Sequence, residues 1–523
     1  MKKLNVRILF SAAILLLIIN GLNAQLTTTQ VDSLVQNALD KFKVAGVAVA
    51  IIKDGKVIHK KGYGVKSMIT KAPVDEFTNF QIASNSKAFT TAALAILIDD
   101  GKLSWKDKVK KHIPEFKMYN DYVTENFMIE DLLCHRSGLG LGAGDLMFFP
   151  DGTDFTIKDI LNSFQYFKPT SPFRTQFDYD NQLYFVAGEV IARVSGMSWE
   201  KFVTNRIMEP LQMKQSFTAL KEVVDKSTLA IPHSTLTEDG NMKTIELFEE
   251  IVNGAAGGIL SNVEDMSKWM LMQLNKGKYG DNLEKKLFTE ARQREMWQTY
   301  TVMPTGPSPR YNTHFSGYGL GWFLQDMKGN MHVSHTGGLP GMLSKVTLLP
   351  DIGLGVVVLT NTENGGGALF SAVSNSIVDS YLAVAKLDWT TLYASSMETN
   401  QDQGDAVTKK VWETVEAAKN IKINQQNYIG IYKDNWFGNI EIFMKGNQLW
   451  FKSYRSPKLN GPMSFYKDNS FAIKWEYQDM PADALAIFTM GKNGKGQSIQ
   501  MKGISPNIDF SFDFHDLDLQ RVK

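Results

Sequence analysis

The sequence has 523 residues, which are too many for one compact core, so at least two domains are expected. Lys and Arg together number 56 and nearly balance the 55 Asp and Glu residues, for a formal net charge of +1. Because nucleic-acid-binding surfaces are strongly basic, this balance and the lack of a long Lys/Arg run argue against nucleic acid as a partner. The expected partner is a small molecule or a short peptide.

The first 24 residues have the features of an export signal. Three basic residues precede the almost purely apolar stretch 8–19, which is too short for a comfortable membrane span. Ala24 provides a small residue at a cleavage point, so the mature chain is predicted to begin near Gln25. An uncleaved N-terminal anchor is the alternative. We expect an exported protein, periplasmic or secreted, with no membrane span once the signal peptide 1–24 is removed.

Hydrophobic periodicity predicts strands on both sides of a helical middle region. Residues 31–43 have apolar side chains at helical spacing, and the β-branched run 47–52 turns at Asp54-Gly55 into a hairpin. A helix rich in Ala, Leu and Ile starts after Ser84. Later strands are predicted at 332–334, 344–349 and 353–360. This order favours an α/β (α+β) sandwich, in which helices flank a mostly antiparallel sheet.

The composition changes between residues 388 and 424, and we interpret this segment as a polar linker and helix between two domains. The run 395–404 is polar and predicts a loop, whereas 405–419 predicts a charged helix. The first domain then spans 25–387 and the second spans 425–523.

Short alternating strands with Gly, Asn and Asp at their turns recur through the second domain. The tripeptides Lys445-Gly446-Asn447 and Lys467-Asp468-Asn469 each separate two such strands. These hairpins indicate a small all-β antiparallel barrel or sandwich, with aromatic side chains filling its interior or, as the alternative, lining a ligand cavity. A further strand is predicted from the strict alternation of Phe510, Phe512 and Phe514.

Few residues could support metal or cysteine chemistry. The sequence has no His-Glu-x-x-His motif, and His332 and His335, three apart on a predicted strand, would point to opposite faces. Cys134 is the only cysteine, so we expect a buried small apolar residue rather than a nucleophile or half of an internal disulfide. A Gly-x-Ser-x-Gly elbow and a phosphate loop are also missing. No metal or other cofactor is therefore expected.

The tetrapeptide Ser84-Asn85-Ser86-Lys87, at the start of a predicted helix, is the first candidate for a catalytic centre. Residues three apart on a helix share a face, so the Ser84 hydroxyl can meet the Lys87 amine. A serine hydroxyl needs a neighbour that takes its proton, and a lysine can do so when its pKa is lowered. Alone the pattern is weak, because an ordinary helix start with a capping serine looks the same.

Two later segments change this interpretation: 179–181 (Tyr-Asp-Asn) and 334–338 (Ser-His-Thr-Gly-Gly). With the first motif they resemble, in order and spacing, the Ser-x-x-Lys, Tyr-x-Asn and Lys/His-Thr-Gly motifs of the serine β-lactamase, penicillin-binding protein and family VIII esterase superfamily. The chain looks most like the class C β-lactamase and D-Ala-D-Ala carboxypeptidase branch. Segments 131–139 and 318–322 also have counterparts there, and the resemblance covers about 34–381.

The resemblance implies a role for each residue of the first two motifs. Ser84 would attack a carbonyl group and form an acyl-enzyme. Lys87 and Tyr179 would share the proton transfers, with Tyr179 as the base if nearby cations keep its phenol anionic. A core tyrosine with a satisfied hydroxyl is the alternative for Tyr179. Asn181 would orient Lys87 and the substrate amide.

The third motif would form the far wall of the substrate cleft. His335 would favour a substrate carboxylate or the tetrahedral state, unless it is a surface histidine at a strand end. Thr336 is assigned to substrate binding with it. Gly337 and Gly338 would let the substrate backbone approach closely, and the N–H of Gly338 with that of Ser84 would form the oxyanion hole.

One departure from the family pattern concerns substrate choice. Most β-lactamases of this branch have Lys where this chain has His335, which is only partly charged near neutral pH. The resemblance therefore implies an exported serine hydrolase for small esters, amides or D-amino-acid peptides. A class C-like β-lactamase and a non-catalytic penicillin-binding-like sensor are the alternatives. Through 428–432 and the hairpins, the second domain resembles the lipocalin-like domain that follows such catalytic domains in some peptidases.

Overall fold

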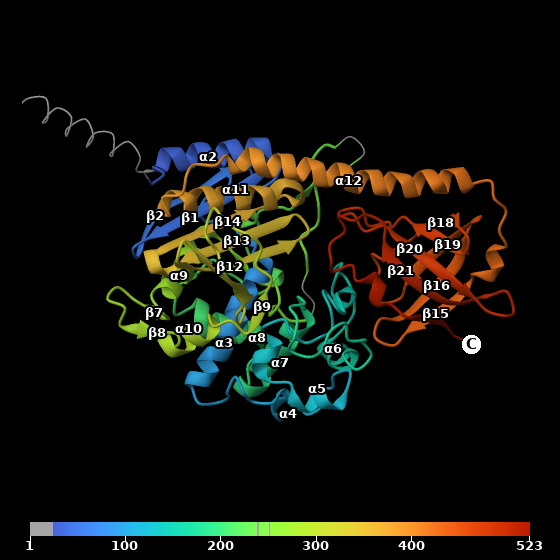
Figure 1. Ribbon diagram of the computed structural model, residues 1–523, viewed down its shortest axis with the longest axis horizontal. Helices are drawn as coiled ribbons and strands as arrows, with labels where there is room; N and C mark the ends of the chain where they lie inside the picture. The colour runs from blue at the N-terminus through green and yellow to red at the C-terminus, as the bar shows by residue number, and fades with distance from the viewer. Residues whose placement is uncertain (1–24, 238–239, 250–251, 523) are drawn as a thin grey trace, which may run out of the picture.

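The structure is a computed structural model that describes residues 25–237, 240–249 and 252–522. The predicted export signal lies outside the described residues. Figure 1 shows a layered α/β domain beside a β-barrel, with the long helix α12 running along both. Within the described ranges, no helix combines the length and the apolar character needed to cross a bilayer.

An eight-stranded antiparallel sheet forms the centre of the first domain. Its strand order is β2-β1-β14-β13-β12-β11-β10-β9, so the N-terminal hairpin pairs with a strand from the end of the domain. Strand β12 is longer than predicted and continues through the 334–338 motif, whose glycines are extended and paired with β13. The strands are β1 (Gly46–Lys53), β2 (Lys56–Gly64), β9 (Thr301–Met303), β10 (Ser316–Tyr318), β11 (Phe323–Met327), β12 (Asn330–Leu339), β13 (Met342–Leu349) and β14 (Leu354–Thr360).

Strand β1 shows why the sequence of a central strand is apolar throughout. Val47, Val49 and Ile51 face an apolar core that they share with α2 and α11, whereas Ala48 and Ala50 face a second core on the α9 side. A strand that is buried on both faces needs apolar residues at every position rather than at alternate ones. The sheet covered by helices on both faces confirms the predicted fold class (Figure 1).

The remaining helices of this domain lie mostly on the α9 side of the sheet. Two of them pack side by side and bring the first two sequence motifs together: α3 contains Lys87 of the first motif, and α7 begins directly after the second. The helices are α2 (Thr28–Lys41), α3 (Ser86–Asp99), α4 (Val109–His112), α5 (Asp121–Asn126), α6 (Ile157–Ser163), α7 (Gln182–Ser195), α8 (Trp199–Val203), α9 (Val263–Leu274), α10 (Glu290–Met296) and α11 (Glu363–Tyr381).

The segment between the domains is one 30-residue helix, α12 (Trp389–Ala418), so the predicted loop at 395–404 is wrong. Its buried residues are separated by seven positions or by fourteen and form only a narrow stripe: Thr390, Gly404, Val411 and Ala418. Most of the helix surface is polar and exposed, so apolar periodicity did not reveal a helix here. Helix α12 packs against α11 in the first domain and against β18 in the second.

The second domain is a closed barrel of eight antiparallel strands, which confirms the barrel predicted from the hairpins. Tyr432, Phe451 and Phe488 are among its buried aromatic residues. The strands are β15 (Gly430–Asp434), β16 (Gly438–Lys445), β17 (Gln448–Ser453), β18 (Asn460–Lys467), β19 (Ser470–Ile473), β20 (Ala484–Met490), β21 (Gly496–Gly503) and β22 (Leu519–Arg521).

The segment between β21 and β22 packs on the first domain, and the strand predicted from its alternating phenylalanines is wrong. Phe512 meets Phe149 edge to face with ring centroids 5.1 Å apart, and Phe167 meets Trp436 at 5.1 Å. These ring contacts merge the apolar cores of the two domains into one cluster. The alternation therefore reflects burial against another domain and not a pleated strand.

Arg455 of the barrel binds α6 and the loop that precedes it. Its guanidinium donates to Asp154 at 2.6 Å and to both carboxylate oxygens of Asp159 at 3.1 Å, and it lies 3.8 Å from the ring centroid of Phe155. Burial acts to raise the pKa of Asp159, but hydrogen bonds from Arg455 and Thr156 outweigh it and lower this pKa to about 2. Protonation of Asp159 is therefore linked to docking of the barrel.

Replacement of Arg455 by Ala is expected to lower the free energy of unfolding by about 1–2 kcal/mol near neutral pH. Because the pKa of Asp159 is lower in the folded chain, this contribution is fully present above about pH 4 and is lost as the pH falls towards 2. Urea unfolding of the wild type and R455A across this range measures the difference, with K433A on the exposed face of β15 as the control. A difference that does not change with pH would contradict this linkage.

Candidate active site

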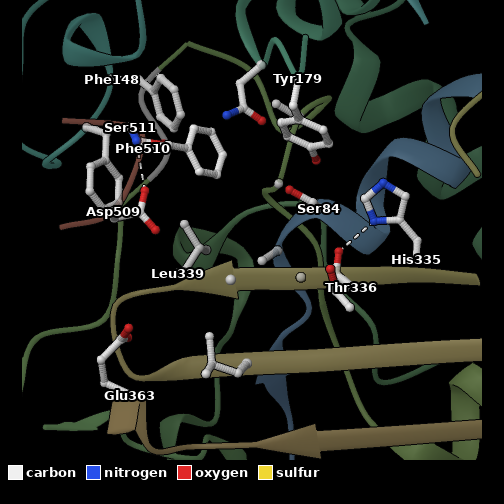
Figure 2. Close-up of a pocket in the computed structure, with 18 of the residues that line it drawn as sticks. Ser84, Phe148, Tyr179, His335, Thr336, Leu339, Glu363, Asp509, Phe510 and Ser511 are labelled. Atoms are coloured by element: carbon white, nitrogen blue, oxygen red, sulfur yellow. Dashed lines mark hydrogen bonds between the residues drawn. The ribbon is translucent and has the colours of Figure 1, made fainter. Parts of the chain in front are cut away.

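Ser84 lies in a short 3₁₀ turn that leads directly into α3 (Figure 2). Ala83 has a φ of 49°, a left-handed conformation that is unusual for a residue with a side chain. The turn rests on the sheet, because Asn85 donates to the Ser344 hydroxyl at 2.8 Å and Ser344 donates to the Ile82 carbonyl at 2.8 Å. The Ser84 side chain is thereby presented, partly exposed, to the cavity beside the sheet.

Lys87 is fully buried, and three oxygens surround its amine. Nζ lies 3.0 Å from Ser84 Oγ, 2.7 Å from Asn181 Oδ1 and 2.8 Å from the Ala256 carbonyl oxygen. The helical spacing thus brings the hydroxyl and the amine together. Asn181 donates through Nδ2 to Asp145 at 2.8 Å, which fixes its amide with the oxygen towards Lys87.

Tyr179 lies beside Ser84, with its hydroxyl directed towards it (Figure 2). Its ring centroid is 4.1 Å from that of His135 and 5.8 Å from that of Phe510 in the barrel segment, and Lys87 Nζ lies 4.9 Å from it. Desolvation raises the pKa of Tyr179 above its usual value, and the interaction with Ser84 opposes this only in part. The phenol is therefore neutral in the free protein, in contrast to the anionic base considered from the sequence.

His335 is buried, and both of its ring nitrogens have partners. Nδ1 lies 2.6 Å from the Thr336 carbonyl oxygen and Nε2 lies 2.8 Å from the Tyr318 hydroxyl, so a neutral ring with its proton on Nδ1 fits both. Burial and the charge of Lys87 lower the pKa of His335 to about 3, despite the bond to Thr336. This geometry argues against a partly charged His335 that holds a substrate carboxylate, although His335 and Thr336 do line the cavity.

Gly337 and Gly338 differ in the space that is available for a Cβ atom. A Cβ at Gly337 would lie 2.1 Å from the Ile82 carbonyl oxygen, so this glycine lets β12 pack against the Ser84 turn rather than against substrate. At Gly338 the nearest atom to a Cβ belongs to Leu343, 3.4 Å away, and the residue is exposed and lines the cavity. Of the two, Gly338 fits the predicted close approach of substrate. The oxyanion hole formed with Ser84 stays a prediction.

A cavity of about 340 Å³ connects these groups with the barrel. Figure 2 shows Ser84 and His335 towards one end of it and two carboxyl groups, those of Glu363 and Asp509, towards the other. Desolvation raises the pKa of Glu363 to about 7; the Gly341 N–H opposes this shift, and the charge of Asp509 adds to it. Burial also raises the pKa of Asp509. No Lys or Arg is among the described residues that line this cavity.

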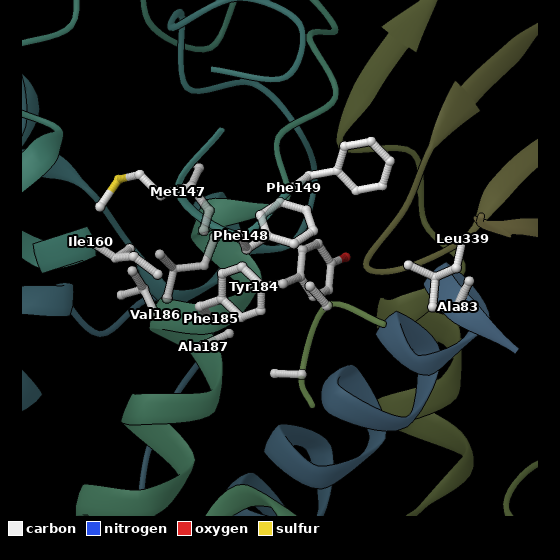
Figure 3. Close-up of a cluster of buried hydrophobic side chains, with 14 of the residues drawn as sticks. Ala83, Met147, Phe148, Phe149, Ile160, Tyr184, Phe185, Val186, Ala187 and Leu339 are labelled. Carbon is white, nitrogen blue, oxygen red and sulfur yellow. The ribbon is translucent and has the colours of Figure 1, made fainter. Parts of the chain in front are cut away.

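The phenylalanines Phe148 and Phe149 form an apolar wall of the cavity. Phe148 packs edge to face on Phe185 of α7, with ring centroids 5.3 Å apart. Figure 3 shows these rings beside α7, with Leu339 of β12 on the other side of the cluster. Rings on one side and a strand on the other leave a largely apolar space next to the nucleophile.

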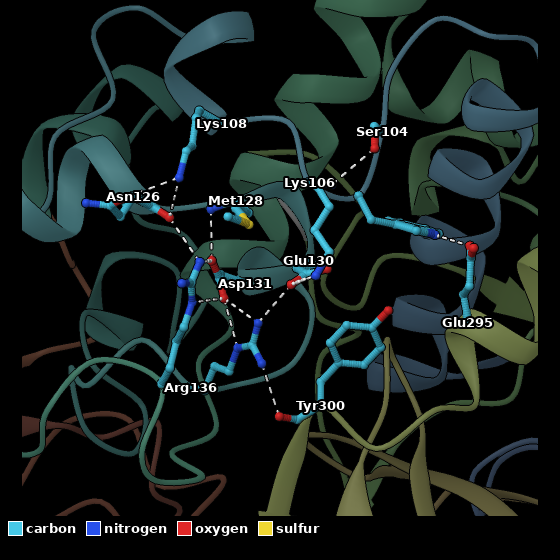
Figure 4. A network of polar contacts seen from close by, with 12 residues as sticks. Ser104, Lys106, Lys108, Asn126, Met128, Glu130, Asp131, Arg136, Glu295 and Tyr300 are labelled. Atoms are coloured by element: carbon cyan, nitrogen blue, oxygen red, sulfur yellow. Dashed lines mark hydrogen bonds and ion pairs between the residues drawn. The ribbon is translucent and has the colours of Figure 1, made fainter.

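A buried ion-pair network holds the segment that carries His135 (Figure 4). Asp131 is fully buried and accepts from Nε of Arg136 at 2.8 Å and from Nη2 of Arg174 at 2.6 Å. Paired in this way, a carboxylate can remain charged in the interior. His135 accepts a bond from the Asp180 N–H at 3.1 Å and so supports the backbone next to Tyr179.

Cys134 is fully buried, and desolvation raises the pKa of its thiol to about 12. This confirms the prediction of a small packing residue. His332 and His335 are three apart on β12 and point to opposite faces, as expected for a strand. In the part of the chain that the structure describes, no group of three His, Cys, Asp or Glu side chains is arranged to hold a metal ion.

Five residues of the site were not found from the sequence: Asp145, Tyr318, Glu363, Asp509 and Ser511. Tyr318 belongs to the segment 318–322 that resembles the family, so a signal for it was present. Asp145 and Glu363 lie outside any recognised motif. Asp509 and Ser511 come from the other domain, and no local pattern predicts which loop of a barrel reaches a neighbouring site.

Two family models match the chain. One, described as Beta-lactamase, matches residues 31–372 and so includes all three motifs. The other, described as a domain of unknown function (DUF3471), matches residues 423–521, which correspond to the barrel.

Similar proteins include an unguisins hydrolase (ungD') from Aspergillus campestris, 28% identical over 368 residues, which are 69% of this chain and 67% of that protein. Protein flp from Staphylococcus aureus strain N315 is 29% identical over 344 residues, or 64% of this chain and 63% of that protein. The matched region thus spans about two thirds of these relatives.

Two solved structures share the fold. The octameric penicillin-binding protein homologue from Pyrococcus abyssi has a TM-score of 0.60 and 20% identity, and the match covers 92% of this chain and 99% of that one. A penicillin-binding protein from Bacillus halodurans has a TM-score of 0.53 and 22% identity, with 65% and 99% covered. Because the β-lactamase model spans well over half of the sequence and these folds agree, the chain belongs to the β-lactamase family, within the serine β-lactamase and penicillin-binding protein superfamily.

Proposed function

We propose that the protein is an exported serine hydrolase that forms an acyl-enzyme on Ser84 and acts on small esters, amides or D-amino-acid peptides. The observation that carries this proposal is the position of the Ser84 hydroxyl, 3.0 Å from the Lys87 amine and facing Tyr179 in an apolar-walled cavity. A relative named as a hydrolase supports hydrolysis. Export rests on the signal pattern of residues 1–24 alone.

Lys87 is the proton acceptor in this proposal. In its amine form, two N–H bonds go to Asn181 and to the Ala256 carbonyl, and the lone pair faces Ser84 Oγ. Oγ then bonds to the substrate carbonyl carbon as its proton moves to Nζ. The proton passes through the Tyr179 hydroxyl to the leaving group while the bond to that group breaks. Water hydrolyses the resulting ester by the same steps in reverse, which frees Ser84.

The charges around the cavity favour some of the candidate substrates over others. His335 is neutral with both nitrogens bonded, so a substrate carboxylate, such as that of a penicillin, finds no cationic partner among the described lining residues. Such a carboxylate would also meet Glu363 and Asp509 at the far end. A neutral or amine-bearing substrate has neither disadvantage. This supports a peptidase or esterase rather than a class C-like β-lactamase.

A fluorescent fluorophosphonate is expected to label the protein on Ser84, and S84A should abolish labelling and lower turnover by about 10³-fold or more. Turnover of a short acyl ester and of a D-alanyl dipeptide amide, measured beside that of a cephalosporin, should be faster for the two uncharged or amine-bearing compounds. The exposed Ser104 offers a matched control, S104A, which should behave as wild type. A folded wild type that is neither labelled nor active on any of the three compounds would instead favour a non-catalytic sensor.

Glu363 acquires its negative charge as the pH rises through about 7, because its pKa is raised to about 7. A p-nitrophenyl ester whose acyl chain ends in trimethylammonium should therefore gain kcat/KM relative to its neutral tert-butyl isostere between about pH 6 and 8, by about threefold or more. E363Q should flatten this ratio without altering hydrolysis of the neutral ester, whereas E413Q on the exposed face of α12 should change nothing. An unchanged ratio in E363Q would show that Glu363 does not sense substrate charge.

A further inference from the structure

A chain of hydrogen bonds connects the barrel domain to the amine of Lys87. Lys87 donates to Asn181 Oδ1 at 2.7 Å, and Asn181 donates through Nδ2 to Asp145 Oδ2 at 2.8 Å. The hydroxyl of Ser511, which belongs to the irregular segment between β21 and β22, donates to the same oxygen of Asp145 at 2.8 Å. Every member of this chain is buried, so each bond forms without competition from bulk water.

Asp513 of the same barrel segment fixes the backbone around Asp145. Its carboxylate accepts the N–H of Gly144 at 2.8 Å and that of Leu146 at 2.9 Å, on either side of Asp145. The approach is close, since a Cβ at Gly142 would lie 2.8 Å from the Phe510 carbonyl oxygen. The barrel segment therefore holds both the main chain and the side chain of Asp145.

The direction of these bonds matters for Asn181. Its amide oxygen can face Lys87 only while its NH₂ group has an acceptor on the other side, and Asp145 Oδ2 is that acceptor. Asp145 Oδ2 has lone pairs for both Asn181 and Ser511, and it accepts from them most strongly when the carboxyl group is ionised. Its other oxygen, Oδ1, is buried and has no hydrogen-bond partner among the described residues, so the carboxylate depends on the two donors at Oδ2.

Several charged groups surround Asp145. Burial raises its pKa well above the usual value, the bonds from Asn181 and Ser511 lower it, the carboxylate of Asp180 raises it and Lys87 lowers it. Asp513, on the barrel side, is also a carboxyl group whose interaction with Asp145 is repulsive. Loss of the Ser511 donor therefore shifts Asp145 towards its protonated form.

We infer that Ser511 is a positioning residue for acylation, which holds Asp145 so that Asn181 keeps Lys87 in place against Ser84. This inference rests on the proposed hydrolase function. The barrel on this reading completes the catalytic centre of the first domain and does more than accompany it. In this role Ser511 acts on Lys87 indirectly, through its hydrogen bond to Asp145 and the bond of Asp145 to Asn181.

The test is the rate at which Ser84 is phosphonylated by a fluorophosphonate, with loss of fluoride, and acylated by a p-nitrophenyl ester, in the full-length protein, from about pH 5 to 9. In S511A we expect acylation to be about tenfold slower near neutral pH, with KM changed by less than about twofold. The acid limb of the pH–rate profile should move to higher pH, because Asp145 then loses its proton only at higher pH. S511T keeps the hydroxyl and should restore the rate and the profile.

Ser464 on β18 provides a matched control, since its hydroxyl makes an exposed 3.5 Å contact with Gln448. S464A should match the wild type in rate, profile and melting temperature. A labelled wild type with an unaltered S511A would overturn the inference alone. The inference would also be overturned if S511A were slower but S511T did not restore the rate and the pH profile did not move. Such a result would show that Ser511 contributes only to packing. A folded wild type that is not labelled at all would overturn the proposed function, and this inference with it.

Discussion

The amine of Lys87 has to be kept away from water and still be held in one position, and the rest of the site is built around this requirement. A buried amine is costly unless its hydrogen bonds are satisfied, and here the nearby Ser84 and two remote residues, Asn181 and Ala256, supply the oxygens. The pairing of α3 with α7, and the packing of the Ser84 turn on β12, are what bring these segments together. The packing of these elements thus places the oxygen atoms around Lys87 Nζ.

The same requirement explains why the groups around the nucleophile are uncharged. Tyr179 is a neutral phenol, and His335 and His135 are neutral imidazoles whose pKa values are lowered by burial and by the nearby lysine. Aromatic rings fill space without adding a second charge that would need a partner of its own. The titratable groups that line the cavity lie at its distant end, where burial raises the pKa values of Glu363 and Asp509.

Sequence reasoning succeeded where one local period or one motif determines the outcome. The both-faced apolar pattern of β1, the hairpins of the barrel and the Ser84–Lys87 spacing are of this kind. It failed where a distant segment decides: α12 is covered along one narrow stripe only, and the alternation around Phe512 serves a contact with Phe149. The Nε2 of His335 is bonded to the Tyr318 hydroxyl from another strand, and Ser511 reaches Asp145 across 366 positions of sequence. A pattern within a short stretch of sequence cannot predict such contacts between distant segments.

The contact of Phe149 with Phe512 and that of Phe167 with Trp436 have an evolutionary consequence. Each half of the molecule supplies one ring of each pair, so a change of ring in one half loses packing unless the other half changes with it. Recombination that joined this scaffold to an unrelated C-terminal module would leave aromatic surface uncovered a short distance from the nucleophile. Packing across this interface therefore favours substitutions that occur in both halves together.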